Sequence, residues 1–100
     1  MIGIIVHHEV NEGMEADGRK ATQANGEAMK SFAGFVVRYT IVSRDHPRQL
    51  TTVTLWQTHE DYGRWTESDA NCNLVRQPGI WTSKPDMAVF DVLGELRHAR

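Results

Sequence analysis

The chain has 100 residues, 40% of them hydrophobic and 24% charged, so it has room for only one domain. Its formal net charge of −2 argues against nucleic acid or an anionic membrane as the main partner. Cys72 is the single cysteine, which excludes a disulfide within the chain, and no apolar run approaches the roughly 20 residues that a membrane span needs. We therefore expect a cytoplasmic protein in which residues 1–96 form the domain and residues 97–100 a short basic tail.

The first half of the chain predicts a strand, a helix and a second strand. Residues 2–10 are rich in Ile and Val and end at the turn-forming segment Asn11-Glu12-Gly13. Residues 14–32 suit a helix, and Gly34 follows them as the residue expected just past a helix end. Residues 35–44 are again rich in β-branched side chains and predict the second strand.

The second half of the chain predicts a third strand, a further helical region and a last strand. Residues 50–57 predict a third strand, and the short connection that precedes them favours an antiparallel hairpin. Thr58 and Asp61 form a Ser/Thr-x-x-acid helix start. The elements expected after this start are a helix over residues 59–68, a shorter helical piece over 69–76 and a last strand over 87–96. The order β-α-β-β-α-β is that of the ferredoxin-like split βαβ unit, so we expect an α+β fold with an antiparallel four-stranded sheet.

Apolar residues stand next to each other in the predicted strands, as in Ile4-Ile5-Val6 and Val36-Val37. Because neighbouring strand residues point to opposite faces, both faces of the sheet carry apolar side chains. Two helices cover only one of these faces. We therefore expect a homodimer in which the sheets of two copies face each other. The alternative is a monomer with a scattered apolar surface.

The inward stripe of the first predicted helix has small residues in its middle and large ones at its ends. At steps of three and four residues it reads Met14, Gly18, Ala21, Asn25, Ala28 and Phe32. Such a stripe fits two arrangements equally well. The helix packs closely on the sheet, or a cavity lies between them.

Three large aromatic residues gather where the third strand meets the second predicted helix. Trp56 ends the strand, while Tyr62 and Trp65 leave one face of the helix because they are three residues apart. Together they suit either a hydrophobic core or the wall of a site for an aromatic ligand. Trp81, in the late loop, fits either a lid over that site or a contact between two copies of the chain.

His7 and His8 are neighbours on the first strand, so they face opposite sides and cannot jointly bind one metal ion. His7 shares its side with Glu9, which permits an imidazole base oriented by a carboxylate. Each histidine is a candidate base or a structural hydrogen-bonding group, and the sequence leaves open which one faces a cavity. No metal-binding or phosphate-binding motif is present in the sequence, so we expect no metal site.

The segment Leu55-Trp56-Gln57-Thr58, followed by Tyr62, resembles the Trp-x-Ser/Thr box of the antibiotic biosynthesis monooxygenase family. Ala33-Gly34-Phe35 stands where that family often has Pro-Gly-Phe. The resemblance implies a small dimeric α+β barrel. Some members of the family oxidise a phenol to a quinone without a cofactor.

The resemblance also implies site residues. In the members that oxidise phenols, a Tyr six residues after the box Trp and an Arg twenty residues after it correspond to Tyr62 and Arg76. Thr52 replaces an Asn that stands four residues before the Trp. We expect the reaction to involve Trp56, Tyr62 as a hydrogen-bond donor, Arg76 as a cation, and His7 or His8 as a base. We expect the substrate to contact Trp65, Thr52, Asn25 and Trp81.

The function expected on these grounds is a cofactor-independent monooxygenase that acts on a small phenolic or quinol-like aromatic molecule, with dioxygen as co-substrate. One alternative, favoured by Thr52 and Val75, is a non-catalytic homodimer that binds a small ligand. The other is haem degradation, for which Trp65 matches a helix Trp of the haem-degrading relatives. Haem is disfavoured because the axial His position falls at Val75, which cannot ligate iron, although the thiolate of Cys72 lies near it in sequence.

Overall fold

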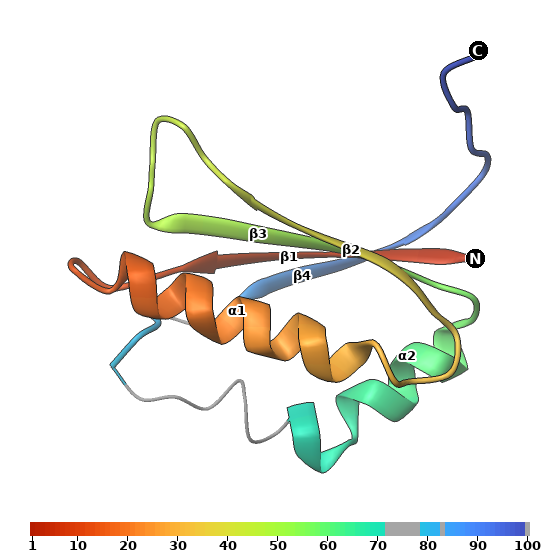
Figure 1. Cartoon of the computed structure of the whole chain (residues 1–100), viewed down its shortest axis with the longest axis horizontal. Helices are drawn as coiled ribbons and strands as arrows, with labels where there is room; N and C mark the ends of the chain where they lie inside the picture. The colour runs from red at the N-terminus through yellow and green to blue at the C-terminus, as the bar shows by residue number, and fades with distance from the viewer. Residues whose placement is uncertain (72–78, 83, 100) are drawn as a thin grey trace.

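A computed structural model of the chain describes residues 1–71, 79–82 and 84–99 (Figure 1). Its helices and strands follow the predicted order β-α-β-β-α-β, so the ferredoxin-like α+β class is confirmed. The elements are β1 (Ile2–Glu9), α1 (Glu15–Met29), β2 (Phe35–Val42), β3 (Gln49–Trp56), α2 (His59–Thr66) and β4 (Asp86–Asp91).

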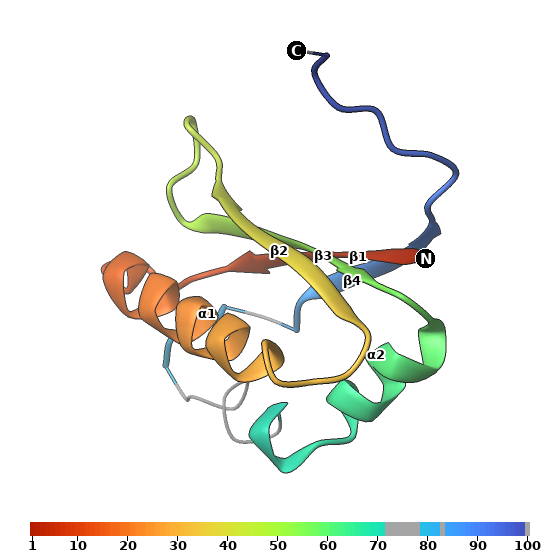
Figure 2. The ribbon, with the colours of Figure 1, turned by 45° about the vertical axis from the view of Figure 1, so that its right-hand side comes forward.

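The four strands form one antiparallel sheet in the order β2-β3-β1-β4. Both helices lie on the same face of this sheet, and the residues that follow β4 rise on the opposite side (Figures 1 and 2). None of the helices in the described part of the chain is long and apolar enough to cross a membrane. The sheet therefore has one face covered by helices and a second, outer face.

The register of the strands assigns side chains to these two faces. Ile4 pairs with Thr54 and His8 with Leu50, and these residues point toward the helices. Their neighbours point outward. The outer face carries apolar side chains on every strand, namely Ile5, Val37, Tyr39, Ile41, Val53, Leu55, Ala88 and Phe90. The expectation that both faces of the sheet are apolar is thereby confirmed.

The last strand is shorter than predicted, because β4 ends at Asp91 and the expected strand runs to residue 96. Asp91 pairs with Ile2, the first residue of β1, and the N–H of Val92 donates to the carbonyl of Met1 at 3.1 Å. The pairing of β1 with β4 thus runs from the Ile2–Asp91 pair to the His7–Asp86 pair. Helix α1 is also shorter than predicted, at Glu15–Met29 instead of 14–32. Residues 69–71 are helical, and the remainder of the helical piece expected over 69–76 lies outside the described residues.

The core between sheet and helices consists of two clusters. One contains Ile2, Ile4, Met29, Trp56 and Trp65, and the other contains Val10, Ala21, Leu50 and Ile80. Gly18 permits the second cluster, because a Cβ at Gly18 would collide with Cγ1 of Val10. Close packing therefore explains the small residues in the first half of α1.

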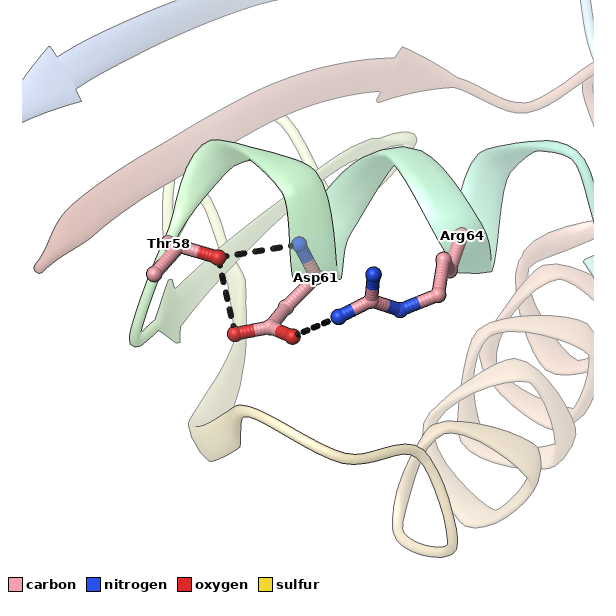
Figure 3. A network of polar contacts seen from close by, with 3 residues as sticks. All are labelled: Thr58, Asp61 and Arg64. Carbon is pink, nitrogen blue, oxygen red and sulfur yellow. Dashed lines mark hydrogen bonds and ion pairs between the residues drawn. The ribbon is translucent and has the colours of Figure 1, made fainter.

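The start of α2 is held by a network of three side chains (Figure 3). The hydroxyl of Thr58 accepts from the backbone N–H of Asp61 at 3.1 Å and donates to the Asp61 carboxylate at 2.9 Å. Arg64 pairs with the same carboxylate, and these contacts, the Thr58 hydrogen bond above all, lower the pKa of Asp61. Gly34, at φ +87°, leaves room for this carboxylate. The predicted cap is confirmed, and it sets which residues of α2 face the sheet.

Candidate functional site

A cavity of about 250 Å³ lies between the sheet and the two helices. Its floor comes from all four strands and its sides from α1, α2 and residue 71, and residues 84–85 before β4 also line it. The residues that line it are Ile4, Val6, His8, Asn25, Met29, Arg38, Thr52, Thr54, Tyr62, Trp65, Asn71, Lys84, Pro85 and Met87. Most of the lining is apolar, and a few polar groups are placed within it.

Five residues predicted for the site lie on this cavity: His8, Asn25, Thr52, Tyr62 and Trp65. They come from β1, α1, β3 and α2, so the fold brings together positions that are far apart in the sequence. The second half of α1 therefore borders a cavity through Asn25, whereas its first half is closely packed. Both readings of the small-residue stripe apply, each to a different part of the helix.

The two histidines of β1 are separated by the sheet. His8 points toward the helices and lines the cavity. His7 points to the outer face, where its Nδ1 lies 2.8 Å from the hydroxyl of Thr51 on β3. Of the two candidate bases, only His8 reaches this cavity.

Trp56 lies in the core and is not among the described residues that line the cavity. It is fully buried at 0% exposure, and its Nε1 donates to the hydroxyl of Thr54 at 3.2 Å. Its ring supports the cavity from behind, since the centroids of Trp56 and Tyr62 are 5.8 Å apart. Phe35 packs on its other side at 5.4 Å. The residue expected in the reaction is thus placed one layer behind the wall.

Two other predicted site residues are not placed on the cavity. Trp81 forms an isolated bridge with Val10 and packs its ring on His8, with centroids 5.1 Å apart. It therefore contacts a residue of the cavity wall without lining the cavity. Arg76 lies outside the described residues. So do Cys72 and Val75, the two residues considered above as possible positions for a haem ligand.

His8 is held in its neutral form. Burial, the positive charge of Arg38 and the neighbouring His7 lower the pKa of His8 to about 4. At neutral pH its imidazole therefore has a free nitrogen that accepts a hydrogen bond or a proton. An imidazole of this kind inside an apolar cavity is a candidate proton acceptor for a bound hydroxyl group.

Tyr62 presents a hydroxyl group at the same cavity. Its only hydrogen-bond partner among the described residues is the weakly accepting sulfur of Met87, at 3.0 Å. Burial raises the pKa of Tyr62, so the phenol stays protonated and remains a donor. A ligand oxygen would be a stronger acceptor than the thioether.

Arg38 is a site residue that the sequence analysis missed. It extends from β2 toward α1, where Nη2 donates to the carbonyl of Thr22 at 3.0 Å and Nη1 lies 3.5 Å from the sulfur of Met29. Burial lowers the pKa of Arg38 to about 10, which leaves it charged at neutral pH. The only sequence signal is that a single cation interrupts the apolar run from Phe35 to Val42.

A larger hollow of about 470 Å³ lies at the end of the sheet near the loop between β2 and β3. It is lined mainly by exposed charged and polar side chains, including Glu9, Asp45, His46 and Asp86. The smaller cavity encloses an aromatic ligand better, because most of its wall surface is apolar and it lies between secondary-structure elements. Among the described residues, no three His, Cys, Asp or Glu side chains gather closely enough to hold a metal ion.

No family model and no curated protein matches the chain. Solved structures do match. An antibiotic biosynthesis monooxygenase has a TM-score of 0.84 at 9% identity, over 94% of this chain and 100% of that one. SnoaB, a cofactor-independent oxygenase from Streptomyces nogalater, has a TM-score of 0.84 at 14% identity, over 97% of both chains. The NE2512 protein of unknown function from Nitrosomonas europaea has a TM-score of 0.82 at 12% identity, over 99% of this chain and 95% of that one.

At these identities the likeness shows the fold. The chain has the fold of the antibiotic biosynthesis monooxygenases, which confirms the resemblance at that level. The same fold also occurs in a protein of unknown function. The reaction therefore has to be argued from the cavity and its residues.

Proposed function

We propose that the chain is a cofactor-independent monooxygenase that acts on a small phenolic or quinol-like aromatic molecule, with dioxygen as co-substrate. The observation that carries this proposal is the cavity, whose lining includes a neutral imidazole, an available phenol hydroxyl and the ring of Trp65. The fold supports the proposal, because SnoaB is a cofactor-independent oxygenase. A volume of about 250 Å³ restricts the substrate to a small molecule, since typical ligand pockets measure roughly 300–1,000 Å³.

In the proposed reaction the substrate first loses the proton of its hydroxyl group to His8. The resulting phenolate passes one electron to dioxygen, which gives a phenoxyl radical and superoxide. These radicals combine into a peroxide on a ring carbon, and the proton returns from His8 to the peroxide. Loss of water then yields the quinone. One oxygen atom of dioxygen stays in the product and the other leaves as water.

The cavity favours this sequence in two ways. Its apolar wall excludes water, which strengthens every electrostatic contact to the developing oxyanion and protects the radical pair. Tyr62 donates a hydrogen bond to the substrate oxygen, and Trp65 provides a flat surface for the ring. A pKa of about 4 keeps His8 neutral and able to accept a proton at neutral pH, and it also makes His8 a weaker base than an ordinary imidazole.

Oxygen uptake with hydroquinone- and anthrone-type compounds on metal-free protein tests the proposal. We expect His8→Gln to lower the rate by roughly 10²- to 10⁴-fold, the usual contribution of a general base. Tyr62→Phe should lower it by roughly 10²-fold through loss of one donor to the oxyanion. Tyr39→Phe is the matched control, because Tyr39 lies on the outer face with 60% exposure.

No uptake above the rate without protein would contradict the proposal. Equal rates in the wild type, His8→Gln and Tyr62→Phe would show that His8 and Tyr62 do not have the roles assigned to them. A second candidate function, a binding protein without turnover, is favoured by Thr52, which is buried on the cavity and offers a hydroxyl where the oxidising members have an amide. Binding of the same compounds without oxygen consumption would support that function.

We also propose that two copies of the chain form a homodimer through the outer faces of their sheets. Tyr39, Ile41 and Phe90 on that face are 60%, 53% and 49% exposed. The segment after β4 rises on the same side of the sheet (Figure 1). Its residues Leu93 and Leu96 are 98% and 101% exposed. A contiguous apolar surface of this kind is typical of protein–protein contact. Light scattering is expected to give twice the chain mass of 11.4 kDa.

A further inference from the structure

The guanidinium group of Arg38 carries its charge at the wall of the cavity without an acidic partner. Among the described residues, no Asp or Glu forms an ion pair with it. Residues 72–78 and 83, outside the described range, contain no Asp or Glu in the sequence. A guanidinium has five N–H donors, and two of them bond to Thr22 and Met29. Among the described residues the charge of Arg38 therefore has no counter-ion.

The helix opposite Arg38 has a glycine where the guanidinium lies. A Cβ at Gly26 would sit 2.9 Å from Cδ and 3.0 Å from Nε of Arg38. Glycine disfavours a helix interior, so its presence in the middle of α1 needs a packing reason. The space for Arg38 supplies one. The side chain of Arg38, on β2, thus packs into space that Gly26 leaves on α1.

The remaining polar groups of the cavity point to the same kind of ligand. Lys84 is a second cation on the lining, and the described lining residues include no acidic side chain. Two buried polar atoms of lining residues have no hydrogen-bond partner among the described residues, Nε of Arg38 and Oδ1 of Asn25. One is a charged donor and the other an acceptor. Buried groups of this kind normally find a partner.

We propose that the cavity binds its ligand as an anion, a planar aromatic molecule whose negatively charged oxygen is held by Arg38 and whose hydroxyl group donates to Asn25. The proposal rests on the proposed function for its site, and it adds a residue and a substrate class to it. A phenolate and an aromatic carboxylate share this chemistry. A quinol that has lost one proton satisfies both groups at once.

If Arg38 had a purely structural role, its replacement would have a different effect on ligand binding. An arginine that only filled the space between β2 and α1 would be replaced by an apolar side chain of similar length without loss of ligand selectivity. An arginine that holds an anion would lose affinity for anions alone when it is replaced. The two roles are therefore distinguished by comparing an anionic ligand with its neutral analogue.

Calorimetric titration of the full-length protein with three probes makes this comparison. The probes are 4-hydroxybenzoate, its neutral analogue 4-hydroxybenzamide, and 4-nitrophenol at a pH where it is ionised. We expect the wild type to prefer at least one of the two anions to the amide. Arg38→Met should weaken binding of that anion by roughly 10- to 100-fold, the loss expected for a hydrogen bond to a charged group, and leave the amide unchanged.

Two variants serve as controls. Arg19→Met removes the same kind of charge from an exposed position on α1 and should leave all three affinities unchanged. Arg38→Lys retains the charge without the planar fork and should recover part of the anion affinity. A measurement that needs no variant is the absorbance titration of bound 4-nitrophenol, whose pKa should be lower in the wild-type cavity than in water.

Equal affinity of the wild type for the anions and the amide would overturn the proposal, as would an unshifted pKa of bound 4-nitrophenol. An equal loss of anion and amide affinity in Arg38→Met would assign Arg38 a structural role and overturn it as well. Anion-selective binding without oxygen uptake would support this inference and remove the proposed oxygenation. The two proposals can therefore fail separately.

Discussion

His8 is the residue at which burial and charge act together. Its imidazole lies between the cavity and the ring of Trp81, and Arg38 adds a positive charge nearby. Each of these surroundings disfavours a second positive charge. Neutral His8 and cationic Arg38 consequently form a pair in which the arginine keeps the charge. Such a pair suits the deprotonation of a bound phenol, because the cation stabilises the oxyanion while the imidazole accepts the proton.

The shifted pKa of His8 predicts how stability depends on pH. In the unfolded chain His8 takes up a proton below its ordinary pKa of 6.5, whereas in the folded protein it does so only near 4. The unfolded state thus binds more protons between these values. The part of the unfolding free energy that comes from neutral, buried His8 should therefore be complete above about pH 6.5. It should be lost as the pH falls toward 4. The His8 contribution to this fall is on the order of 2 kcal/mol, after allowance for its partial exposure.

Urea unfolding of the wild type and His8→Gln at about pH 7.5 and about pH 4.5 isolates this contribution, because all other titrating groups are common to both proteins. The difference in unfolding free energy between the two should shrink or reverse in favour of the variant at the lower pH. A difference that is the same at both pH values would show that folding does not change the pKa of His8.

At the scale of elements, the contact between α1 and β2 is governed by Gly26 and Arg38. Replacing a helical glycine by alanine normally stabilises by up to about 1 kcal/mol, because it restricts the unfolded chain. Here the new Cβ would meet the Arg38 side chain at 2.9 Å and displace it. Helix α1 is thus less stable with glycine at position 26 than it would be with alanine, and the glycine makes room for the Arg38 side chain.

This contact predicts a strong coupling between the two positions. We expect Gly26→Ala to be neutral or destabilising in the wild type and stabilising by up to about 1 kcal/mol in Arg38→Ala, which removes the Cδ that the new Cβ would meet. Chemical denaturation of the two single variants and the double variant measures the coupling. Gly63→Ala is the matched control, because Gly63 lies in α2 with nothing within 4 Å of its added Cβ, and it should stabilise in both backgrounds. Additive effects of Gly26→Ala and Arg38→Ala would contradict the proposed packing of Arg38 against Gly26.

Elements were predictable where the signal is local. The cap at Thr58, the glycine at position 34 and the β-branched runs each act through a few neighbouring residues, so the order of helices and strands followed from them. The end of β4 was not predictable in this way. It is set by where β1 begins to pair, which is a contact between the two ends of the chain.

The candidate site was predictable in its composition and less so in its arrangement. The i, i+3 spacing placed Tyr62 and Trp65 on one helix face, and both line the cavity. Alternation along β1 separated His7 from His8, but the side that the helices cover is a tertiary property. Arg38 was missed because its partners, Thr22 and Gly26, come from α1 through long-range packing. Trp56 and Trp65 both belong to the buried core, and the packing of α2 on β3 decides that only Trp65 also lines the cavity.

The surface of the whole molecule is large for its mass. A folded monomer of 11.4 kDa is expected to expose about 5,800 Å², whereas this chain exposes 7104 Å². Its radius of gyration of 14.1 Å also exceeds the roughly 12.7 Å expected for a compact domain of 100 residues. The excess agrees with an uncovered sheet face and an extended segment after β4. Stable dimers typically bury about 800 Å² per partner, so the excess surface is large enough to include an interface of that size.

A single charge on the outer face should therefore prevent assembly. We expect Ile41→Lys to convert a species of twice 11.4 kDa into one of 11.4 kDa in light scattering, because the lysine would be buried without a partner in the dimer. Unfolding should then lose its dependence on protein concentration, which the wild type shows if folding and association are coupled. Ala24→Lys adds the same charge on the exposed side of α1 and should leave the mass unchanged. A wild type that remains at 11.4 kDa at all concentrations would remove the dimer, and a dimer that survives Ile41→Lys would place the interface elsewhere on the surface.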